Sequence, residues 1–271
     1  MVARRTRPDS EKLSNEEALR EALAVREAEI EELRLQIAKM VSTGGHFLAE
    51  AAHAVRSPLA ITHSYLEILH SDLSDGLTVD QQSFLTIAYE NAVKLRQLVD
   101  DLVDLAAFET GTARIEPAPV FVSDIIASLR SEWRSIAEHK GLRLRTEISE
   151  GLPSVAVDED RLKDVLRRLV DNAFRFTPMG GSVFVRASGD DKRVTIEVVD
   201  SGVGIPADRI DDSFEAFVQL HRQPGENREG YGLGLPLCRR MVQAFGGTLD
   251  LASTEGQGTT VTIRIPVSRR E

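Results

Sequence analysis

The first part of the chain carries a hydrophobic repeat with heptad spacing. Residues 10–42 are rich in Glu, Ala, Leu and Arg and contain no Gly or Pro. The positions that step by four and three residues, with one polar break, are Leu19, Leu23, Arg26, Ile30, Leu33, Ile37 and Met40. This spacing predicts a coiled-coil helix over residues 1–45. A single amphipathic helix that lies on a domain is the alternative.

Two more seams with the same spacing follow and predict an antiparallel helical hairpin over residues 46–112. The first seam consists of Leu48, Ala52, Val55, Leu59, Thr62, Leu66 and Leu69. The second consists of Phe84, Ala88, Asn91, Leu95, Leu98, Leu102 and Leu105. The segment at residues 70–80 between them resembles a turn. Because such a hairpin buries only one stripe of each helix, we expect two copies to form a dimeric four-helix bundle in a homodimer.

From about residue 118 the pattern mixes strands with helices. Residues 118–149 predict a short strand, a helix and a strand, and residues 158–177 predict an amphipathic helix. A β-hairpin, another helix and a final β-hairpin are then predicted over residues 181–200, 234–247 and 248–266. Helices mixed with antiparallel strands favour an α+β sandwich over residues 118–269, with helices on one face of the sheet. The whole chain is thus predicted to be multidomain, α followed by α+β.

Composition narrows the range of functions. The chain has 33 basic and 43 acidic residues in 271, a net charge of −10, which disfavours general nucleic-acid binding. A nucleotide site made from backbone amides and a metal ion is still compatible with that charge. The single cysteine, Cys238, excludes an intrachain disulfide and a cysteine metal cluster. With no long apolar run and no signal-peptide pattern, we expect no membrane span and a cytoplasmic location.

Glycine is concentrated in three segments: "DSGVGI" at residues 200–205, "GYGLGLPL" at 230–237 and "EGQGTT" at 255–260. Such segments let a backbone approach a ligand closely, although a loop glycine is more often structural. The second segment lacks the final glycine of the dinucleotide fingerprint. It also lacks the Lys-Ser/Thr pair of a P-loop. No familiar phosphate loop is therefore present in any one segment.

The order of the segments is more informative than each of them. "VDNAFRFTP" at residues 170–178 comes first, then "DSGVGI", "FEAF" at 214–217, "GYGLGL" and "GQGTT". In this order the sequence resembles a sensor histidine kinase. Such kinases have the Bergerat-type ATP-binding domain that is shared with topoisomerase, mismatch-repair and heat-shock-chaperone ATPases. The resemblance covers about residues 46–267 and implies ATP and Mg²⁺ as cofactors.

The resemblance assigns roles to individual residues. Asn172 would be the Mg²⁺ ligand, which suits an oxygen donor beside a hydrated ion, and Arg175 would meet the phosphates unless it forms a surface ion pair. Asp200 would accept a hydrogen bond from the adenine amino group, or else cap a turn. Gly202 and Gly204 would let the chain turn against the base.

Later segments complete the expected nucleotide site. Phe217, with Phe214, resembles the family's F box, although core packing explains such residues equally well. Residues 219–229 would form a lid over the nucleotide. The segment that would present amides to the phosphates contains Gly230, Gly232, Leu233 and Gly234. Gly256, Gly258 and Thr259 resemble the last glycine box, where a tight strand turn is an equally good explanation.

The phosphate acceptor of the family lies in a pattern like His-Glu-x-Arg-Thr-Pro-Leu. Residues 53–59 read "HAVRSPL", so the resemblance makes His53 the acceptor, accompanied by Arg56 and Ser57. The nearby histidines lack the Arg-Ser-Pro context. The phosphoryl group would then pass to an aspartate of a separate response regulator. We also hypothesise that Pro58 bends the helix and lets the ATP domain reach His53.

Three departures from the family pattern leave alternatives open. Ala54 replaces an acidic residue that would take the imidazole proton, and Glu50 is a candidate substitute. Ser57 replaces Thr but keeps a hydroxyl that phosphatase activity would need. Arg168 replaces an asparagine, which would add phosphate affinity or disturb the metal site.

These departures keep three functions in view. The first is an autokinase. The second is a phosphatase-biased or degenerate kinase that binds ATP but chiefly dephosphorylates or scaffolds its regulator. The third is a Bergerat ATPase without phosphotransfer. An upstream sensor protein would deliver the stimulus through the coiled coil, unless the chain has been trimmed.

Overall fold

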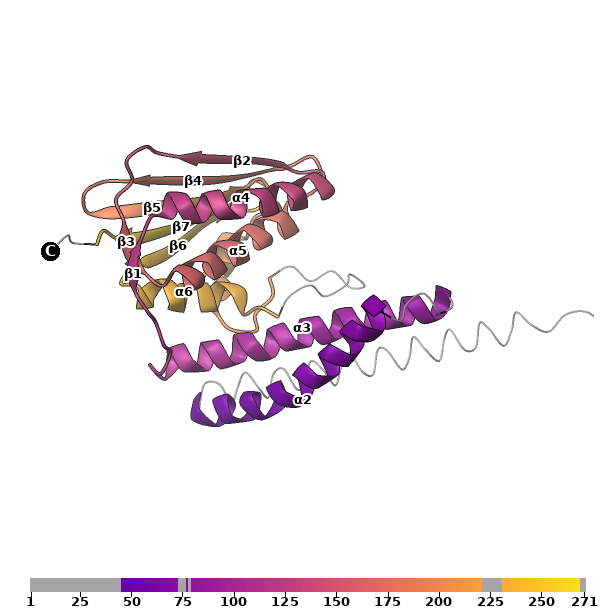
Figure 1. The fold of residues 1–271 in the computed structure, drawn as a ribbon. Coiled ribbons are helices and arrows are strands. Elements are labelled where there is room, and N and C mark those ends of the chain that lie inside the picture. Colours follow the sequence, from indigo (N-terminus) through magenta and orange to yellow (C-terminus); the bar gives the residue numbers. More distant parts are fainter. Residues whose placement is uncertain (1–44, 73–76, 78, 221–230, 269–271) are drawn as a thin grey trace, which may run out of the picture. The chain divides into compact units, whose positions relative to one another are not determined.

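Two long helices form the first part of the structure. The computed structural model describes residues 45–72, 77, 79–220 and 231–268, so the expected coiled coil lies outside the described residues. Helix α2 (Gly45–Asp72) and helix α3 (Val79–Glu109) pack along each other as a hairpin (Figure 1). The predicted pair of helices is confirmed, and α2 continues through Pro58.

The hairpin buries part of its apolar surface and leaves another part exposed. The side chains buried between its helices or against the rest of the chain include Leu59, His63, Ala92, Val99, Leu102 and Leu105. The exposed apolar side chains are Val55, Ile61, Tyr65, Ile68, Leu69, Ile87 and Leu95. The predicted seams therefore divide between two faces. Val55 and Leu95 are exposed by 47% and 43%, so within one chain they do not belong to the core.

The second part is an α/β sandwich that begins with three short elements. Strand β1 (Ala118–Val120) leads into helix α4 (Val122–His139), which is followed by strands β2 (Arg143–Ile148) and β3 (Val155–Val157). Strands β1 and β3 pair with each other in a small antiparallel sheet. The sequence pattern did not predict β3, which has only three residues.

Helix α5 (Glu159–Phe176) begins at a clear N-terminal signal. The Asp158 carboxylate accepts a hydrogen bond from the Arg161 N–H at 3.2 Å, and two acidic residues follow in the first turn. Apolar residues on one face of α5, including Leu162, Leu166, Leu169 and Phe174, are fully buried against the sheet and its neighbours. This amphipathic face fixes which side chains of α5 point away from the core.

The main sheet has five strands in the order β2-β4-β5-β7-β6. Its remaining strands are β4 (Ser182–Gly189), β5 (Arg193–Asp200), β6 (Thr248–Thr254) and β7 (Gly258–Pro266). All neighbours are antiparallel except β2 and β4, which are parallel, so the expectation of antiparallel strands alone was incomplete. Helices α4, α5 and α6 (Gly234–Ala244) cover one face of the sheet (Figure 1), as predicted.

Two short 3₁₀ turns, Ala207–Arg209 and Asp211–Phe214, connect the end of β5 to the segment before α6. Helix α6 ends before Gly246, whose φ of +71° is the left-handed conformation common after a helix. No helix among the described residues is long and apolar enough to cross a membrane.

Candidate nucleotide site and phosphoacceptor helix

Asp200, the last residue of β5, is fixed by two backbone donors. Its Oδ1 accepts hydrogen bonds from the N–H of Gly202 at 2.8 Å and of Thr259 at 3.1 Å. Among the described residues none bonds to Oδ2, which is therefore available to a ligand's donor. Burial raises the pKa of the Asp200 carboxyl above its usual value, and the two N–H donors oppose that shift. A half-buried carboxylate in a fixed orientation is suited to accept a hydrogen bond from an exocyclic amine.

The backbone around Asp200 is packed too closely for side chains. A Cβ on Gly204, where φ is +66°, would lie 2.0 Å from the Thr254 carbonyl oxygen. A Cβ on Gly258, where φ is +107°, would lie 2.0 Å from the Asp200 carbonyl oxygen. Gly202 likewise approaches the end of α5, since its Cβ would lie 2.4 Å from the Phe176 carbonyl oxygen. These glycines hold three segments of backbone together at one edge of the sheet.

A serine that the sequence did not single out joins these segments. Ser253 Oγ accepts from the Ile205 N–H at 2.8 Å and donates to the Gly258 carbonyl at 2.9 Å. It also lies 2.9 Å from the Thr259 hydroxyl. Because Ser253 gives its one proton to Gly258, Thr259 is the donor in that contact. Ser253 thus orients Thr259, and no local sequence signal marks a serine in a strand for such a role.

Asn172 and Arg175 lie one turn apart on α5. The Arg175 guanidinium donates to Asn172 Oδ1 at 3.2 Å and stacks on the Phe176 ring at 4.5 Å. A Cβ on Gly234, at the start of α6, would lie 3.7 Å from Asn172 Nδ2. The structure therefore brings the Asn172 amide beside the helix N-terminus that the sequence predicted for phosphate binding.

The chemistry of this corner fits a magnesium ion that is bound mainly through a nucleotide. The Asn172 amide oxygen already attracts the positive Arg175 guanidinium. No group of three or more His, Cys, Asp or Glu is arranged as a metal cluster in the part of the chain that the structure describes. Mg²⁺ prefers to keep waters and phosphate oxygens and to take only one or two protein oxygens. One amide oxygen is consistent with that preference.

The loop before α6 runs beside the phenylalanine segment. The Phe217 N–H donates to the Gly232 carbonyl at 3.1 Å, and Phe217 itself has a φ of +67°, which is rare for a bulky residue. A Cβ on Gly232 would lie 2.5 Å from the Val218 carbonyl oxygen. Leu233 is buried, so its side chain is part of the core rather than a ligand contact. Gly230 and residues 221–229 of the expected lid lie outside the described residues.

His53 lies in the middle of α2, with its backbone in helical conformation. The side chains of His53, Ala54, Ser57 and Pro58 are outside the described side chains. Arg56, one turn after His53, is described: its guanidinium binds the Asp100 carboxylate of α3 at 2.7 Å. Arg56 therefore ties the two helices of the hairpin together, which the sequence did not predict.

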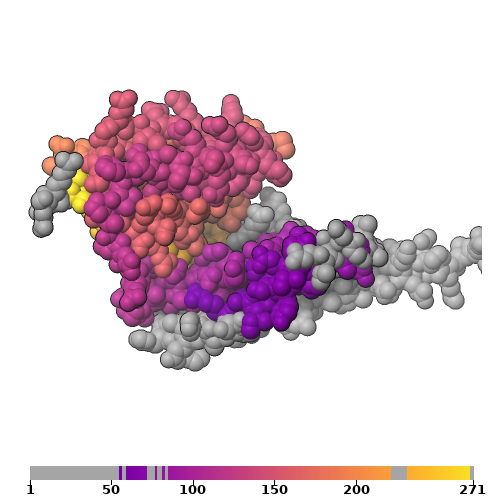
Figure 2. Space-filling view, viewed as in Figure 1, coloured from indigo at the N-terminus to yellow at the C-terminus, as the bar shows by residue number. Residues whose placement is uncertain are grey.

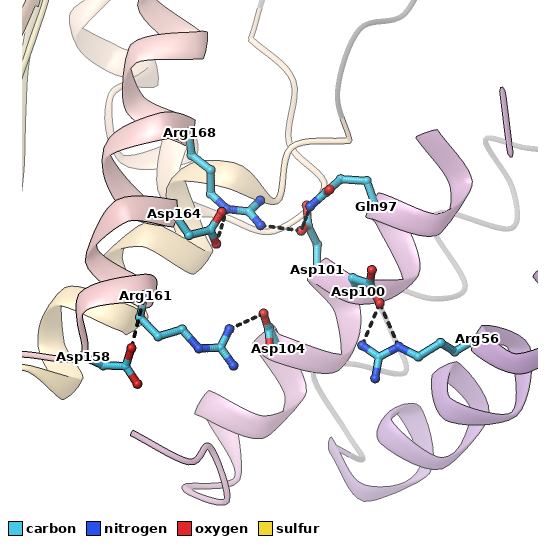
Figure 3. Close-up of polar contacts among 9 residues, drawn as sticks. All are labelled: Arg56, Gln97, Asp100, Asp101, Asp104, Asp158, Arg161, Asp164 and Arg168. Atoms are coloured by element: carbon cyan, nitrogen blue, oxygen red, sulfur yellow. Dashed lines mark hydrogen bonds and ion pairs between the residues drawn. The ribbon is translucent and has the colours of Figure 1, made fainter. Parts of the chain in front are cut away.

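Arg168 is held by two aspartates in this structure. Its guanidinium bonds to Asp164 Oδ2 at 2.9 Å, one turn away on α5, and to Asp101 Oδ1 of α3 at 2.8 Å (Figure 3). Burial on its own would lower the pKa of Arg168, but the hydrogen bonds and charges of the two aspartates raise it. Arg168 is thus engaged in an ion-pair network, which the sequence did not predict.

Two segments of the chain match known protein families. Residues 45–111 match the His Kinase A (phospho-acceptor) domain. Residues 157–269 match the family described as histidine kinase-, DNA gyrase B-, and HSP90-like ATPase. The first range contains His53, and the second contains Asn172, Asp200 and the glycine loops.

Among curated proteins, the chain is similar to the autoinducer 2 sensor kinase/phosphatase LuxQ of Vibrio parahaemolyticus. The two are 30% identical over 270 residues, 97% of this chain and 29% of that protein. It is also 32% identical over 222 residues to the aerobic respiration control sensor protein ArcB of Escherichia coli, 81% of this chain and 28% of that protein. The chain therefore spans less than a third of the length of these relatives.

Among solved structures, the chain resembles full-length ShkA in complex with AMPPNP. The TM-score is 0.70 at 29% sequence identity, and the match covers 83% of this chain and 46% of that one. The similarity thus extends over both the hairpin and the sandwich.

Proposed function

Because the chain belongs to the histidine kinases of two-component signalling, we propose that it transfers the γ-phosphoryl group of ATP to His53. The group then passes to an aspartate of a separate response regulator. One observation carries this proposal: a single chain joins a phosphoacceptor-type hairpin, with His53 in α2, to a sandwich that matches an ATPase family and holds Asp200 and Asn172 beside its glycine loops. We divide the chain accordingly into residues 1–45, 46–112 and 118–269.

The nucleotide is held by residues from four segments. Asp200 Oδ2 accepts from the adenine amino group, while Thr259, oriented by Ser253, lines the same corner. The backbone amides of Gly232 and Gly234 face the phosphates at the start of α6. Arg175 exchanges its bond to Asn172 Oδ1 for a phosphate oxygen, which leaves that amide oxygen for the metal. Mg²⁺, when bound with ATP, would neutralise charge on the phosphates.

The transfer itself is a displacement at phosphorus. A ring nitrogen of His53 attacks the γ-phosphorus, a P–N bond forms, and the P–O bond to the β-phosphate breaks so that ADP leaves. The ring proton must go to a base, for which Glu50 is the candidate because Ala54 supplies none. A regulator carboxylate then attacks the same phosphorus and breaks the P–N bond. ATP and the regulator place these steps in the cytoplasm.

The exposed apolar face of the hairpin supports a homodimer. Val55, Ile68, Ile87 and Leu95 are between 43% and 53% exposed in the single chain. A second hairpin packed on this face would bury them and complete a four-helix bundle. An upstream sensor acting through residues 1–45 is the second partner that we propose.

A second function is favoured by one specific feature. Ala54 removes the acidic group next to His53, while Ser57 keeps a hydroxyl for orienting water. A chain with these two residues would load His53 slowly and retain dephosphorylation of the regulator. The kinase/phosphatase title of LuxQ is in line with this alternative.

One labelling experiment separates the functions. The chain is incubated with γ-labelled ATP and Mg²⁺, and acid-labile, base-stable label on the protein is measured for the unaltered chain, His53→Gln and Asn172→Ala. The autokinase predicts label that both substitutions abolish, while His53→Gln still binds ATP. ATP binding without label favours the phosphatase-biased chain, and steady phosphate release without label favours an ATPase.

A further inference from the structure

Three arginines of the sandwich reach acidic residues on one helix of the hairpin. Arg161 and Arg168 of α5 bind Asp104 and Asp101 of α3, at 2.6 Å and 2.8 Å (Figure 3). Arg240 of α6 binds Glu109, at the end of α3, at 2.7 Å. Figure 2 shows the surfaces of the two parts in contact along α3. The three acidic residues fall on neighbouring turns of α3, so the ion pairs follow the helix over several turns.

The pair between Arg168 and Asp101 is the most enclosed of the three. Their side chains are 15% and 9% exposed, compared with 46% and 39% for Arg240 and Glu109. Exposed ion pairs contribute little, whereas removing one partner of a buried pair is strongly unfavourable. Asp101 also accepts a hydrogen bond from Gln97 at 2.8 Å, which fixes its carboxylate. Among the three ion pairs, this one is therefore the one whose loss should weaken the contact of the sandwich with α3 most.

The adjacent carboxylates of α3 point to different partners. Asp100 binds Arg56 of α2, one turn after His53, and Asp101 binds Arg168 of α5, one turn before Asn172 (Figure 3). Helix α3 thus lies between the helix that carries the acceptor and the helix that carries the expected metal ligand. The sandwich packs on α3 through α6, and α5 reaches the same helix through Arg161 and Arg168.

We propose that the Arg168–Asp101 pair is a latch that holds the nucleotide-binding sandwich against α3 and so opposes phosphotransfer to His53. Transfer requires the γ-phosphate to reach α2, and the latch attaches α5 to the other helix of the hairpin. A signal that displaces α3 relative to α2 would strain Asp100 and Asp101 together and release the sandwich. The latch rests on the proposed kinase function.

Asp101→Asn is the cleanest variant for a test. It removes the charge on α3, while Arg168 keeps Asp164 at 2.9 Å, so α5 retains a partner for its buried guanidinium. The charge exchange Arg168→Asp with Asp101→Arg restores an opposite pair across the contact. Glu132→Gln is the matched control, because Glu132 of α4 forms an exposed ion pair with Arg167 of α5, at 3.3 Å, within the sandwich.

Two measurements on the full chain decide the proposal. Spin labels at Lys94→Cys in α3 and Asp191→Cys in the turn after β4 report the distance between the hairpin and the sandwich. The labelled protein is mixed with excess unlabelled protein, so that the distance is measured within one chain. Both positions are exposed, and the one native cysteine is buried. Initial rates of His53 labelling at saturating ATP are measured on the same variants, together with ATP affinity.

We expect Asp101→Asn to broaden the distance distribution towards longer distances and to raise the labelling rate about tenfold or more, with ATP affinity unchanged. The charge exchange should restore both the short distance and the slow rate, and Glu132→Gln should match the unaltered chain. An unchanged distance, or a lower rate with a longer distance, would overturn the latch. If no form of the chain takes up label, the proposed kinase function fails. The latch is then decided only by whether Asp101→Asn lengthens the spin-label distance and the charge exchange shortens it again.

Discussion

Asp200 at the end of β5 and Thr259 near the start of β7 are joined by a hydrogen bond of 3.1 Å, from the Thr259 N–H to Asp200 Oδ1. The bond links two neighbouring strands at the edge where the glycine loops converge. It fixes one carboxylate oxygen and leaves the other directed to a ligand. The specificity for adenine in our account depends on this arrangement.

Asp200→Asn should weaken ATP binding about 10- to 100-fold, because a hydrogen bond to a charged group contributes about 1.5–3 kcal/mol. In one orientation, the amide of this variant still accepts the two backbone hydrogen bonds at Oδ1, and its NH₂ group then faces the adenine amino group. In the flipped orientation, an uncharged oxygen faces the adenine amino group. Isothermal titration with ATP and GTP measures the change. Asp250→Asn, which alters an exposed carboxylate of β6 paired with Arg264, is the control and should bind ATP normally. If Asp200→Asn and Asp250→Asn bound ATP with equal affinity, the role of Asp200 in adenine binding would be refuted.

The same substitution should stabilise the fold at neutral pH. Since the pKa of the Asp200 carboxyl is raised in the folded chain above its usual 3.8, the folded state binds the proton more tightly than the unfolded state. Its contribution to stability is therefore present below pH 3.8 and is lost as the pH rises through the folded pKa. Asp200→Asn should have a higher Tm than the unaltered chain at pH 7, and the difference should shrink toward pH 4. A difference that grows in acid would contradict this assignment.

Gly204 and Gly256 form a matched pair for testing the close backbone approach. Both have left-handed φ angles, +66° and +75°, but only a Cβ on Gly204 would meet a neighbour. Gly256→Ala should cost about 1–2 kcal/mol for the backbone conformation. Gly204→Ala should cost about 1–3 kcal/mol more from overpacking. Urea unfolding measures both, and equal losses would show that the contact between the Gly204 loop and Thr254 is not close.

Ala54→Glu should raise the rate of autophosphorylation. A carboxylate next to His53 would accept the ring proton that leaves during transfer, and general-base assistance is typically worth about 10²–10⁴-fold. The initial rate of label uptake at saturating ATP is the measurement. Ala54→Gln is the control, since it has a similar shape without the basic oxygen. An unchanged rate in Ala54→Glu would show that Glu50 or water already supplies the base.

The nucleotide corner was predictable because short motifs carry it. Each segment alone is weak evidence, and it was their order, through the resemblance to sensor histidine kinases, that implied Asn172, Asp200 and the glycines at 202, 204, 232 and 234. The structure brings Asn172 next to Gly234 and joins Asp200 to Thr259, two contacts that no single segment indicates. Gly230 and the coiled coil stay predictions.

The latch and the division of the hairpin seams were not predictable from the sequence. Arg168 and Asp101 are separated by 67 positions, and an arginine on an amphipathic helix has no signal for its partner. Val55 and Leu95 fit a heptad seam as well as Leu59 and Leu102 do, because a four-helix bundle needs two apolar faces on each helix. Periodicity shows that a face is apolar, but the docking of helices decides which face is covered.

Mapping the phosphate on the chain tests the central claim most directly. After reaction with ATP and Mg²⁺, trypsin under non-acidic conditions yields a peptide of residues 40–56 that contains His46 and His53, and a peptide of residues 57–94 that contains His63 and His70. Electron-transfer fragmentation then separates His46 from His53. Our account predicts phosphate on His53 alone. Phosphate on His46, His63 or His70, with His53 unmodified, would contradict it.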